Sequence, residues 1–236
     1  MLTVAILAGG LATRLRPVTE RVPKSLLHVN GEPFIAHQLR LLRGNGVRRV
    51  VLCVGFLGEM IRDVLGDGRA FGMEVEYSFD GAKLLGTAGA IRNALPLLRD
   101  AFFVLYGDSY LVCDYAAAER AFKTSGKLAL MTVFRNDGMW DVSNVEFDGA
   151  RILAYSKREL TPRMKFIDYG LGVFSVEAFE RVRAAEPRDL ADLYGELLGE
   201  GELAGMEVSQ RFYEIGSEAG LEETARFLTS QEVARG

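Results

Sequence analysis

Short apolar runs alternate with helix-like stretches along the first half of the chain, and this alternation constrains the fold most strongly. The runs with the length and composition of buried strands are 2–8, 49–54, 73–79 and 101–106. The stretches with apolar residues at helical spacing are 34–43, 58–65 and 84–98. Strands that alternate with helices predict a parallel sheet with helices on both faces. We therefore expect a Rossmann-like α/β fold.

The second half changes rhythm and predicts an antiparallel extension of this sheet. After a helix at 114–123, four strand-like runs follow with only turns between them, at 128–135, 142–147, 152–155 and 169–174. The elements expected after them are helices at 176–183 and 190–198, strands at 203–208 and 212–215, and a last helix that Ser217 can cap. No linker or repeat interrupts the chain, so we expect one domain, 1–236, with a mostly parallel mixed sheet.

Composition excludes several classes of protein. The 236 residues carry a net charge of −4, which argues against non-specific nucleic-acid binding. The apolar runs are too short to span a bilayer, and Met1 leads directly into a strand rather than a signal peptide. The two cysteines, Cys53 and Cys113, are expected to be buried free thiols in a reducing compartment. We therefore expect a cytoplasmic protein with no nucleic-acid or membrane partner.

A glycine turn followed by cations is the strongest functional signal. Gly9-Gly10 ends the first apolar run, and glycines let backbone N–H groups approach a ligand closely. Arg14, Arg16 and Lys24 follow within one loop. Backbone donors and cations are what a polyphosphate needs. The alternative is an ordinary surface loop with solvated cations.

The order Gly9-Gly10, Arg14, Pro17 and Pro23-Lys24 resembles the sugar-1-phosphate nucleotidyltransferase family. The resemblance implies a fold of the GT-A-like kind and a reaction in which a nucleoside triphosphate and a sugar 1-phosphate yield a nucleotide sugar and pyrophosphate. Ala12 stands where the family usually has glycine. Some relatives carry a C-terminal domain of hexapeptide repeats, and we expect none here.

The resemblance also implies which residues meet the nucleotide. The nucleotide-binding set it implies is Leu7, Ala8, Gly9, Gly10, Arg14, Lys24, Gly86 and Thr87. Within it, Gly86 and Thr87 belong to a Gly-Thr-Ala-Gly segment that opens a helix, which by itself indicates only a capped turn. Arg14, Lys24 and Asp108 are the expected catalytic residues.

Two carboxylates are candidates for holding Mg²⁺, the expected cofactor. Asp108 follows a buried strand and Gly107 at the sheet edge where ligands bind, although an aspartate there can also be a plain turn residue. Glu214 precedes Gly216-Ser217, where the family typically has aspartate, and its alternative is a solvated residue beside a helix start. One or two carboxylates with phosphate oxygens suffice for Mg²⁺.

The sugar phosphate is expected to meet the second half of the chain. By resemblance, Lys157 holds the phosphate, while Asp168 and Gly170 line the sugar pocket. Asn144 is also expected to bind the sugar phosphate; it belongs to the cluster 140–144, in which Trp140 either faces the sugar or is buried in a turn. Residues 1–112 then form a nucleotide-binding half, and 113–236 form a sugar-phosphate-binding half.

The nucleophile of this reaction is an anion at neutral pH, so no general base is needed, and His28 and His37 are expected to be structural or exposed. The Leu-Gly-Thr-Ala-Gly run resembles guanylyltransferases for mannose- or heptose-type sugar phosphates. The alternatives are a uridylyltransferase for an amino-sugar phosphate, a cytidylyltransferase for phosphocholine and a catalytically silent nucleotide-sugar sensor. The oligomeric state stays open, homo-oligomers included.

Overall fold

The computed structural model describes residues 1–10, 15 and 17–233. Its strands are β1 (Thr3–Leu7), β2 (His28–Val29), β3 (Glu32–Pro33), β4 (Arg49–Val54), β5 (Glu74–Phe79), β6 (Ala101–Tyr106), β7 (Ser109–Leu111), β8 (Ala129–Arg135), β9 (Val145–Phe147), β10 (Ile152–Tyr155), β11 (Phe166–Ser175), β12 (Leu203–Val208) and β13 (Phe212–Glu214). Its α-helices are α1 (Phe34–Gly44), α2 (Gly58–Leu65), α3 (Gly86–Ala94), α4 (Tyr115–Ser125), α5 (Leu190–Gly199) and α6 (Glu218–Val233).

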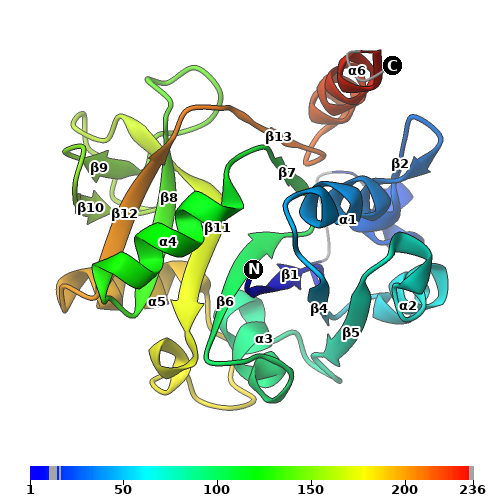
Figure 1. Ribbon diagram of the computed structural model, residues 1–236, viewed down its shortest axis with the longest axis horizontal. Helices are drawn as coiled ribbons and strands as arrows, with labels where there is room; N and C mark the ends of the chain where they lie inside the picture. The colour runs from blue at the N-terminus through cyan, green and yellow to red at the C-terminus, as the bar shows by residue number, and fades with distance from the viewer. Residues whose placement is uncertain (11–14, 16, 234–236) are drawn as a thin grey trace.

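Nine of the described strands form one mixed sheet (Figure 1). Strands β6, β1, β4 and β5 run parallel, as the alternating first half predicts. Strand β11 joins β6 antiparallel and also pairs with β8 and β9, which confirms the antiparallel extension. Strand β12 differs, because it returns through α5 and lies parallel to β8. The expected α/β fold is confirmed.

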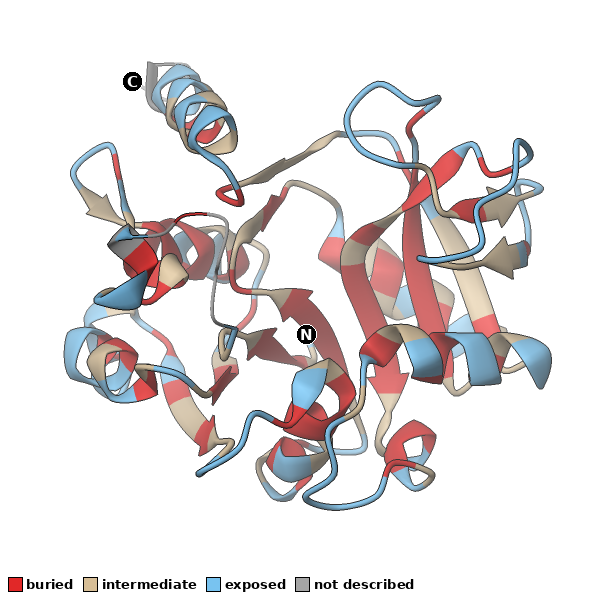
Figure 2. Cartoon of the chain, turned by 180° about the vertical axis from the view of Figure 1, so that it is seen from behind, coloured by how far each residue is buried: buried red, intermediate tan, exposed pale blue. Residues whose placement is uncertain are grey.

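The core occupies both faces of the sheet (Figure 2). On one face α1 and α2 pack on the parallel strands, with fully buried Ile35, Leu39 and Ile61, and α4 packs on β8, β11 and β12. On the other face α3 and α5 pack with buried Ile91 and Leu193. Apolar burial on both faces explains why the parallel strands read as continuous apolar runs.

One expectation about local structure was wrong, and one strand was not foreseen. The helix expected at 176–183 is only a short 3₁₀ turn, Val176–Phe179, after which the chain turns and Ala185 adopts a φ of 60°. Phe179 and Val182 are nevertheless buried, so both side chains reach the core without a helix. The short strand β7 was not expected; it pairs with β13 in a separate two-stranded ribbon.

The ribbon of β7 and β13 carries the chain from the sheet to its last helix. Ser217 Oγ accepts a hydrogen bond from Gly220 N at 3.1 Å, so the expected cap of α6 is present. Leu228 and Ile215 are buried here with Tyr110, in a small third cluster under α6. The ribbon therefore places β13 directly beside the end of β6.

The remaining sequence expectations concern single side chains. Cys53 is buried and Cys113 half-buried, and both are free thiols. His37 is buried with Nε2 at 2.9 Å from the Val29 carbonyl, and His28 is exposed, so both have the structural or surface character expected. None of the helices in the described part of the chain is long and apolar enough to cross a membrane.

Candidate active site

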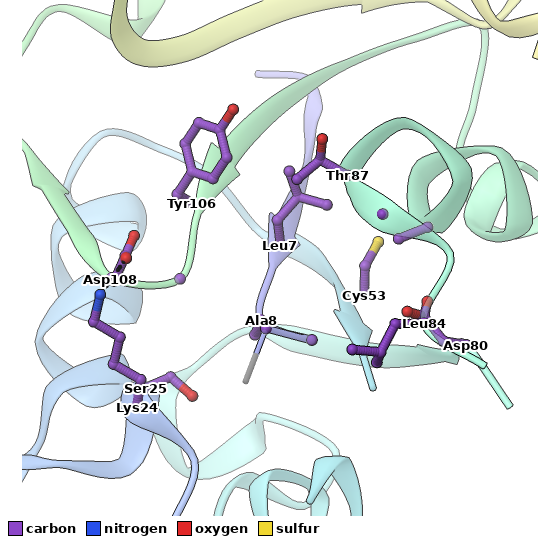
Figure 3. Close-up of a pocket in the computed structure, with 15 residues that line it drawn as sticks. Leu7, Ala8, Lys24, Ser25, Cys53, Asp80, Leu84, Thr87, Tyr106 and Asp108 are labelled. Carbon is purple, nitrogen blue, oxygen red and sulfur yellow. Dashed lines mark hydrogen bonds and ion pairs between the residues drawn. The ribbon is translucent and has the colours of Figure 1, made fainter. Parts of the chain in front are cut away.

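A cavity of about 250 Å³ opens at the carboxyl ends of β1, β4 and β6 (Figure 3). It is lined by Leu7, Ala8, Gly9, Gly10, Lys24, Ser25, Cys53, Asp80, Leu84, Gly86, Thr87, Ala90, Tyr106, Gly107 and Asp108. All of the described residues expected to bind nucleotide are among them. Parallel strands end at one sheet edge, which brings these distant segments together.

The glycines at this edge are required by close backbone contacts. An ideal Cβ on Gly9 would lie 2.9 Å from the Gly55 nitrogen. Gly107 N donates to the Leu7 carbonyl at 2.9 Å, and a Cβ on Gly107 would lie 3.0 Å from that oxygen. The two glycine turns therefore meet, as expected from their places after parallel strands.

Lys24 and Asp108 form one end of the cavity. Lys24 Nζ lies 2.6 Å from Asp108 Oδ2, and both side chains are largely covered. Beside them, the buried Ser25 Oγ has no hydrogen-bond partner among the described residues. The Lys24 ammonium and the unpaired Ser25 hydroxyl are groups that can donate hydrogen bonds to phosphate oxygens.

Asp80 stands at the other end of the cavity, across the apolar floor of Leu7, Ala8 and Cys53 (Figure 3). Its Oδ2 accepts from Leu85 N at 3.1 Å, and burial raises the pKa of this carboxyl. The sequence reading overlooked Asp80. It follows strand β5 as Asp108 follows β6, so the same rule about strand ends could have found it.

The Gly86-Thr87 turn is fixed by the segment before α5. Gly86 has a φ of +68°, and a Cβ there would lie 2.6 Å from the Arg188 carbonyl oxygen. Thr87 Oγ1 accepts from Leu190 N at 2.6 Å and donates to Asp189 Oδ1 at 3.3 Å. The turn lines the cavity as expected, and its threonine hydroxyl is engaged with the start of α5.

Glu214 lies beside the Lys24–Asp108 pair but does not line the cavity. Ile215 N donates to the Asp108 carbonyl at 2.9 Å, which fixes β13 against this turn. An ideal Cβ on Gly216 would lie 3.0 Å from Glu214 Oε1 and 3.4 Å from Lys24 Nζ. Both charged groups therefore border Gly216, and the structure brings the two predicted metal-binding carboxylates to one place.

The donor set at this place fits a hard divalent ion. Asp108 and Glu214 offer carboxylate oxygens, and Mg²⁺ typically takes one or two carboxylates with phosphate oxygens and water. No group of three or more His, Cys, Asp or Glu side chains suited to a metal occurs among the described residues. The two carboxylates thus suit an ion that arrives with a triphosphate.

The residues expected to bind the sugar form a second group on β11 and its neighbours. Asn144 Oδ1 accepts from Asp168 N at 2.9 Å, and Asp168 Oδ1 accepts from Gly170 N at 3.0 Å. Burial raises the pKa of Asp168, against the lowering effects of the Gly170 N–H and of Lys157. Asn144, Asp168 and Gly170 are therefore brought together.

Lys157 connects this second group to the cavity. Its Nζ lies 5.9 Å from the centre of the Tyr106 ring and 4.0 Å from Asp189 Oδ1. Tyr106 lines the cavity, and its ring points from there towards β11 (Figure 3). Lys157 therefore stands between the cavity and Asp168.

The Trp140 ring packs on Arg211, rather than on the residues expected to bind the sugar. The Arg211 guanidinium carbon lies 3.6 Å from the centre of the Trp140 ring. The tryptophan is 44% exposed, so it is not buried in a turn either. Arg14, Arg16 and Ala12 lie outside the described residues.

The sequence of residues 3–141 matches the family model described as nucleotidyl transferase. The chain is 32% identical over 234 residues to the N-acetylmuramate alpha-1-phosphate uridylyltransferase of Neisseria meningitidis, covering 92% of this chain and 94% of that protein. The chain belongs to the sugar-1-phosphate nucleotidyltransferase family.

Other relatives of this nucleotidyltransferase differ in base and sugar. The Mannose-1-phosphate guanylyltransferase catalytic subunit beta of Xenopus tropicalis is 29% identical over 89% of this chain, which spans 60% of that protein. The D-glycero-alpha-D-manno-heptose 1-phosphate guanylyltransferase of Campylobacter jejuni is 33% identical over 46% of this chain and 48% of its own length.

Solved structures show the same fold at low identity. A Bacillus anthracis protein described as a glucose-1-phosphate thymidylyltransferase has a TM-score of 0.84 at 21% identity, covering 96% of this chain and 95% of that chain. HddC from Yersinia pseudotuberculosis, complexed with GMP-PN, has a TM-score of 0.76 at 22% identity, covering 97% of this chain and 100% of that chain.

Family membership makes this chain a nucleotidyltransferase, with a nucleoside triphosphate and a sugar 1-phosphate as the substrates implied for the family. Enzymes of this family generally use divalent metal ions. The relatives transfer guanylyl, uridylyl or thymidylyl groups.

Proposed function

We propose that this nucleotidyltransferase transfers a guanylyl group from GTP to a mannose- or heptose-type sugar 1-phosphate. The observation that carries the choice of base is the Asp80 carboxylate at the end of the cavity opposite Lys24. Guanine presents two adjacent N–H donors on one edge, which match the two oxygens of a carboxylate. Uracil presents one N–H between two carbonyl oxygens, and a carboxylate repels both of these oxygens.

The arrangement of the cavity supports this orientation of the nucleotide. The base would lie against Leu7, Ala8 and the Gly86-Thr87 turn, and the triphosphate would reach Lys24 and Ser25. The backbone at Gly9 and Gly10 would supply N–H donors to phosphate oxygens. Arg14, by resemblance, would add a further cation.

In the proposed reaction a phosphate oxygen of the sugar 1-phosphate attacks the α-phosphorus. An oxygen–phosphorus bond forms, the bond from the α-phosphorus to the bridging oxygen breaks, and pyrophosphate leaves with that electron pair. Lys24 stabilises the added negative charge, and Lys157 orients the attacking phosphate. Mg²⁺, held by Asp108, Glu214 and phosphate oxygens, would neutralise charge on the triphosphate.

Pyrophosphate release over four nucleoside triphosphates and several sugar 1-phosphates tests the proposal. We expect GTP with mannose 1-phosphate or a heptose 1-phosphate to give the highest kcat/KM. Asp80→Asn should raise the KM for GTP by roughly 5- to 150-fold, because an Asn side chain leaves one guanine N–H without an acceptor. Equal use of GTP and UTP by the wild-type enzyme would refute the assigned base.

A uridylyltransferase for an amino-sugar 1-phosphate is the second candidate. The Neisseria meningitidis relative supports it, because that protein matches almost end to end and its name gives both a uridylyl group and an amino sugar. UTP with N-acetylmuramate 1-phosphate or N-acetylglucosamine 1-phosphate therefore belongs in the same panel. Higher kcat/KM with one of these pairs would favour this candidate.

A further inference from the structure

Arg211 joins three segments that are far apart in the sequence. Its Nη1 and Nη2 donate to the two carboxylate oxygens of Glu223 on α6, at 2.7 and 2.9 Å. Its guanidinium carbon lies 3.6 Å from the Trp140 ring centre and 4.6 Å from the Tyr213 ring centre. The side chain is only 21% exposed. Loop 136–144, strand β13 and helix α6 thus meet on one guanidinium.

Hydrogen bonds within loop 136–144 fix the conformation of the loop at this contact. Asn136 is fully buried, and its Oδ1 accepts from Trp140 N at 3.0 Å. Asn136 Nδ2 donates to Ser143 Oγ at 3.0 Å, close to the end of the loop. The loop ends at Asn144, which holds the backbone of Asp168. The position of Trp140 on Arg211 is therefore connected to the group expected to bind the sugar.

The strand side of the contact leads to the proposed metal site. Tyr213 directly precedes Glu214, and its ring stacks on Phe227 of α6 at 3.9 Å between centres. In the ribbon, Tyr213 lies opposite Tyr110 and Glu214 opposite Ser109. Figure 1 shows this connection crossing from β12 to α6. A shift of Tyr213 would move Glu214 relative to Asp108.

We propose that Arg211 is a positioning residue that holds Glu214 at the metal site and loop 136–144 at the sugar site in one fixed arrangement. This inference rests on the proposed function. Glutamate reaches one methylene further than aspartate, so its carboxylate has an additional rotatable bond and depends more on how its backbone is held. A planar guanidinium can bind a carboxylate with its edge and contact aromatic rings with its faces, which lysine cannot do.

The decisive measurement is Mn²⁺ binding by electron paramagnetic resonance, with GTP or UTP present and no sugar phosphate, so that no turnover occurs. Arg211→Ala should weaken Mn²⁺ binding by about 10-fold, the scale of losing a residue that orients a metal ligand. Arg211→Lys should give an intermediate loss. In kinetics, Arg211→Ala should also raise the KM for sugar 1-phosphate, while nucleotide affinity measured without metal stays unchanged.

Arg181→Ala is the matched control. Arg181 is covered to a similar degree and pairs with Glu200 at the end of α5. The Arg181→Ala variant should lower the melting temperature without changing the Mn²⁺ affinity or the KM for either substrate. Trp140→Leu separates the two sides of the contact, because it should raise the KM for sugar 1-phosphate and leave Mn²⁺ binding close to the wild-type value.

A lowered melting temperature for Arg211→Ala with wild-type Mn²⁺ affinity and KM values would overturn the inference, and the proposed function would stand. Wild-type protein that released no pyrophosphate with any substrate pair would instead contradict the proposed function, and the Mn²⁺ comparison would still decide the role of Arg211. If Arg211→Ala does not fold, Arg211→Lys and Glu223→Gln provide the same comparison.

Discussion

Lys24 and Asp108 are the residues that most directly link the sequence to the chemistry. Their side chains lie 2.6 Å apart, although Pro23-Lys24 and Gly107-Asp108 come from separate loops. Both side chains keep some exposure, so water can solvate the remaining charge when one partner is removed, and we expect the pair to matter for catalysis more than for stability. The two residues are therefore expected to act as a unit rather than independently.

Lys24→Ala should lower kcat by roughly 10²-fold or more, the scale of losing one electrostatic donor at a reacting phosphate. Asp108→Asn should lower it at least as much, with little change in thermal unfolding. Because the pair acts as a unit, the double variant should lose less than the product of the two single losses. Steady-state kinetics of the three variants checks this, and fully additive losses would show that the residues work separately.

Asp168 makes stability depend on pH. Burial raises its pKa, so the folded protein holds this proton more tightly than the unfolded chain does. The folded state then binds more protons, and stability falls as pH rises from the ordinary aspartate pKa through the raised value. The charged carboxylate should therefore cost stability near neutral pH.

Asp168→Asn should raise the melting temperature at pH 7, because asparagine can still accept from Gly170 N and carries no charge. The gain should shrink as the pH is lowered below the ordinary aspartate pKa, where both proteins are neutral at this position. Thermal unfolding across pH 3 to 8 measures it. A gain that is independent of pH would mean that charge burial is not the cause.

At the scale of elements, the start of α3 depends on the segment before α5. Arg188 N donates to the Leu85 carbonyl at 2.9 Å, and the Arg188 carbonyl accepts from Ala88 N at 2.9 Å. Gly86 adopts a positive φ inside this contact. Glycine is needed at position 86 because a side chain would be strained at this φ and because a Cβ would collide with the Arg188 carbonyl oxygen.

Gly86→Ala should destabilise the protein by about 1–3 kcal/mol, because alanine is strained at this φ and its Cβ meets a backbone oxygen. Gly195→Ala is the control, since this glycine lies inside α5 and a Cβ there meets nothing within 4 Å. The control should be neutral or stabilising. Chemical denaturation of both variants gives the comparison.

Periodicity predicted the elements well wherever apolar spacing and length agreed. The parallel strands follow from their continuous apolar runs, because both of their faces are buried, and helices α1 to α5 follow from apolar spacing along one buried face. The helix expected at 176–183 failed because buried Phe179 and Val182 fit a turn as well as a helix. Strand β7 is too short to carry a periodic signal.

For the whole molecule, the cavity was predictable and the network around it was not. Parallel strands end at one edge, so Gly9, Gly107 and Asp108 could be placed together from the sequence. Asp80 obeys the same rule. The contact of Trp140 with Arg211 depends on how loop 136–144 packs against the β12–β13 connection, and no local pattern encodes it.

The proposed division of labour between residues 1–112 and 113–236 has its own test. Asn144 holds the backbone of Asp168, outside the cavity proposed for the nucleotide. Asn144→Ala should therefore raise the KM for sugar 1-phosphate or lower kcat, by roughly 5- to 150-fold, and leave nucleotide affinity unchanged. Separate measurements of nucleotide binding and sugar-phosphate kinetics decide it; weakened nucleotide binding with normal sugar kinetics would refute the division.

The chain of contacts from Thr87 through Asp189 to Lys157 has a consequence for how the binding of one substrate affects the binding of the other. Asp189 Oδ1 accepts from Thr87 Oγ1 and lies 4.0 Å from Lys157 Nζ. A sugar phosphate on Lys157, as proposed, would compete with Asp189 for that cation, and Asp189 also holds Thr87, which lines the cavity proposed for the nucleotide. The two substrates are then thermodynamically coupled, so that whatever factor the nucleotide applies to sugar-phosphate affinity, the sugar phosphate applies equally to the nucleotide.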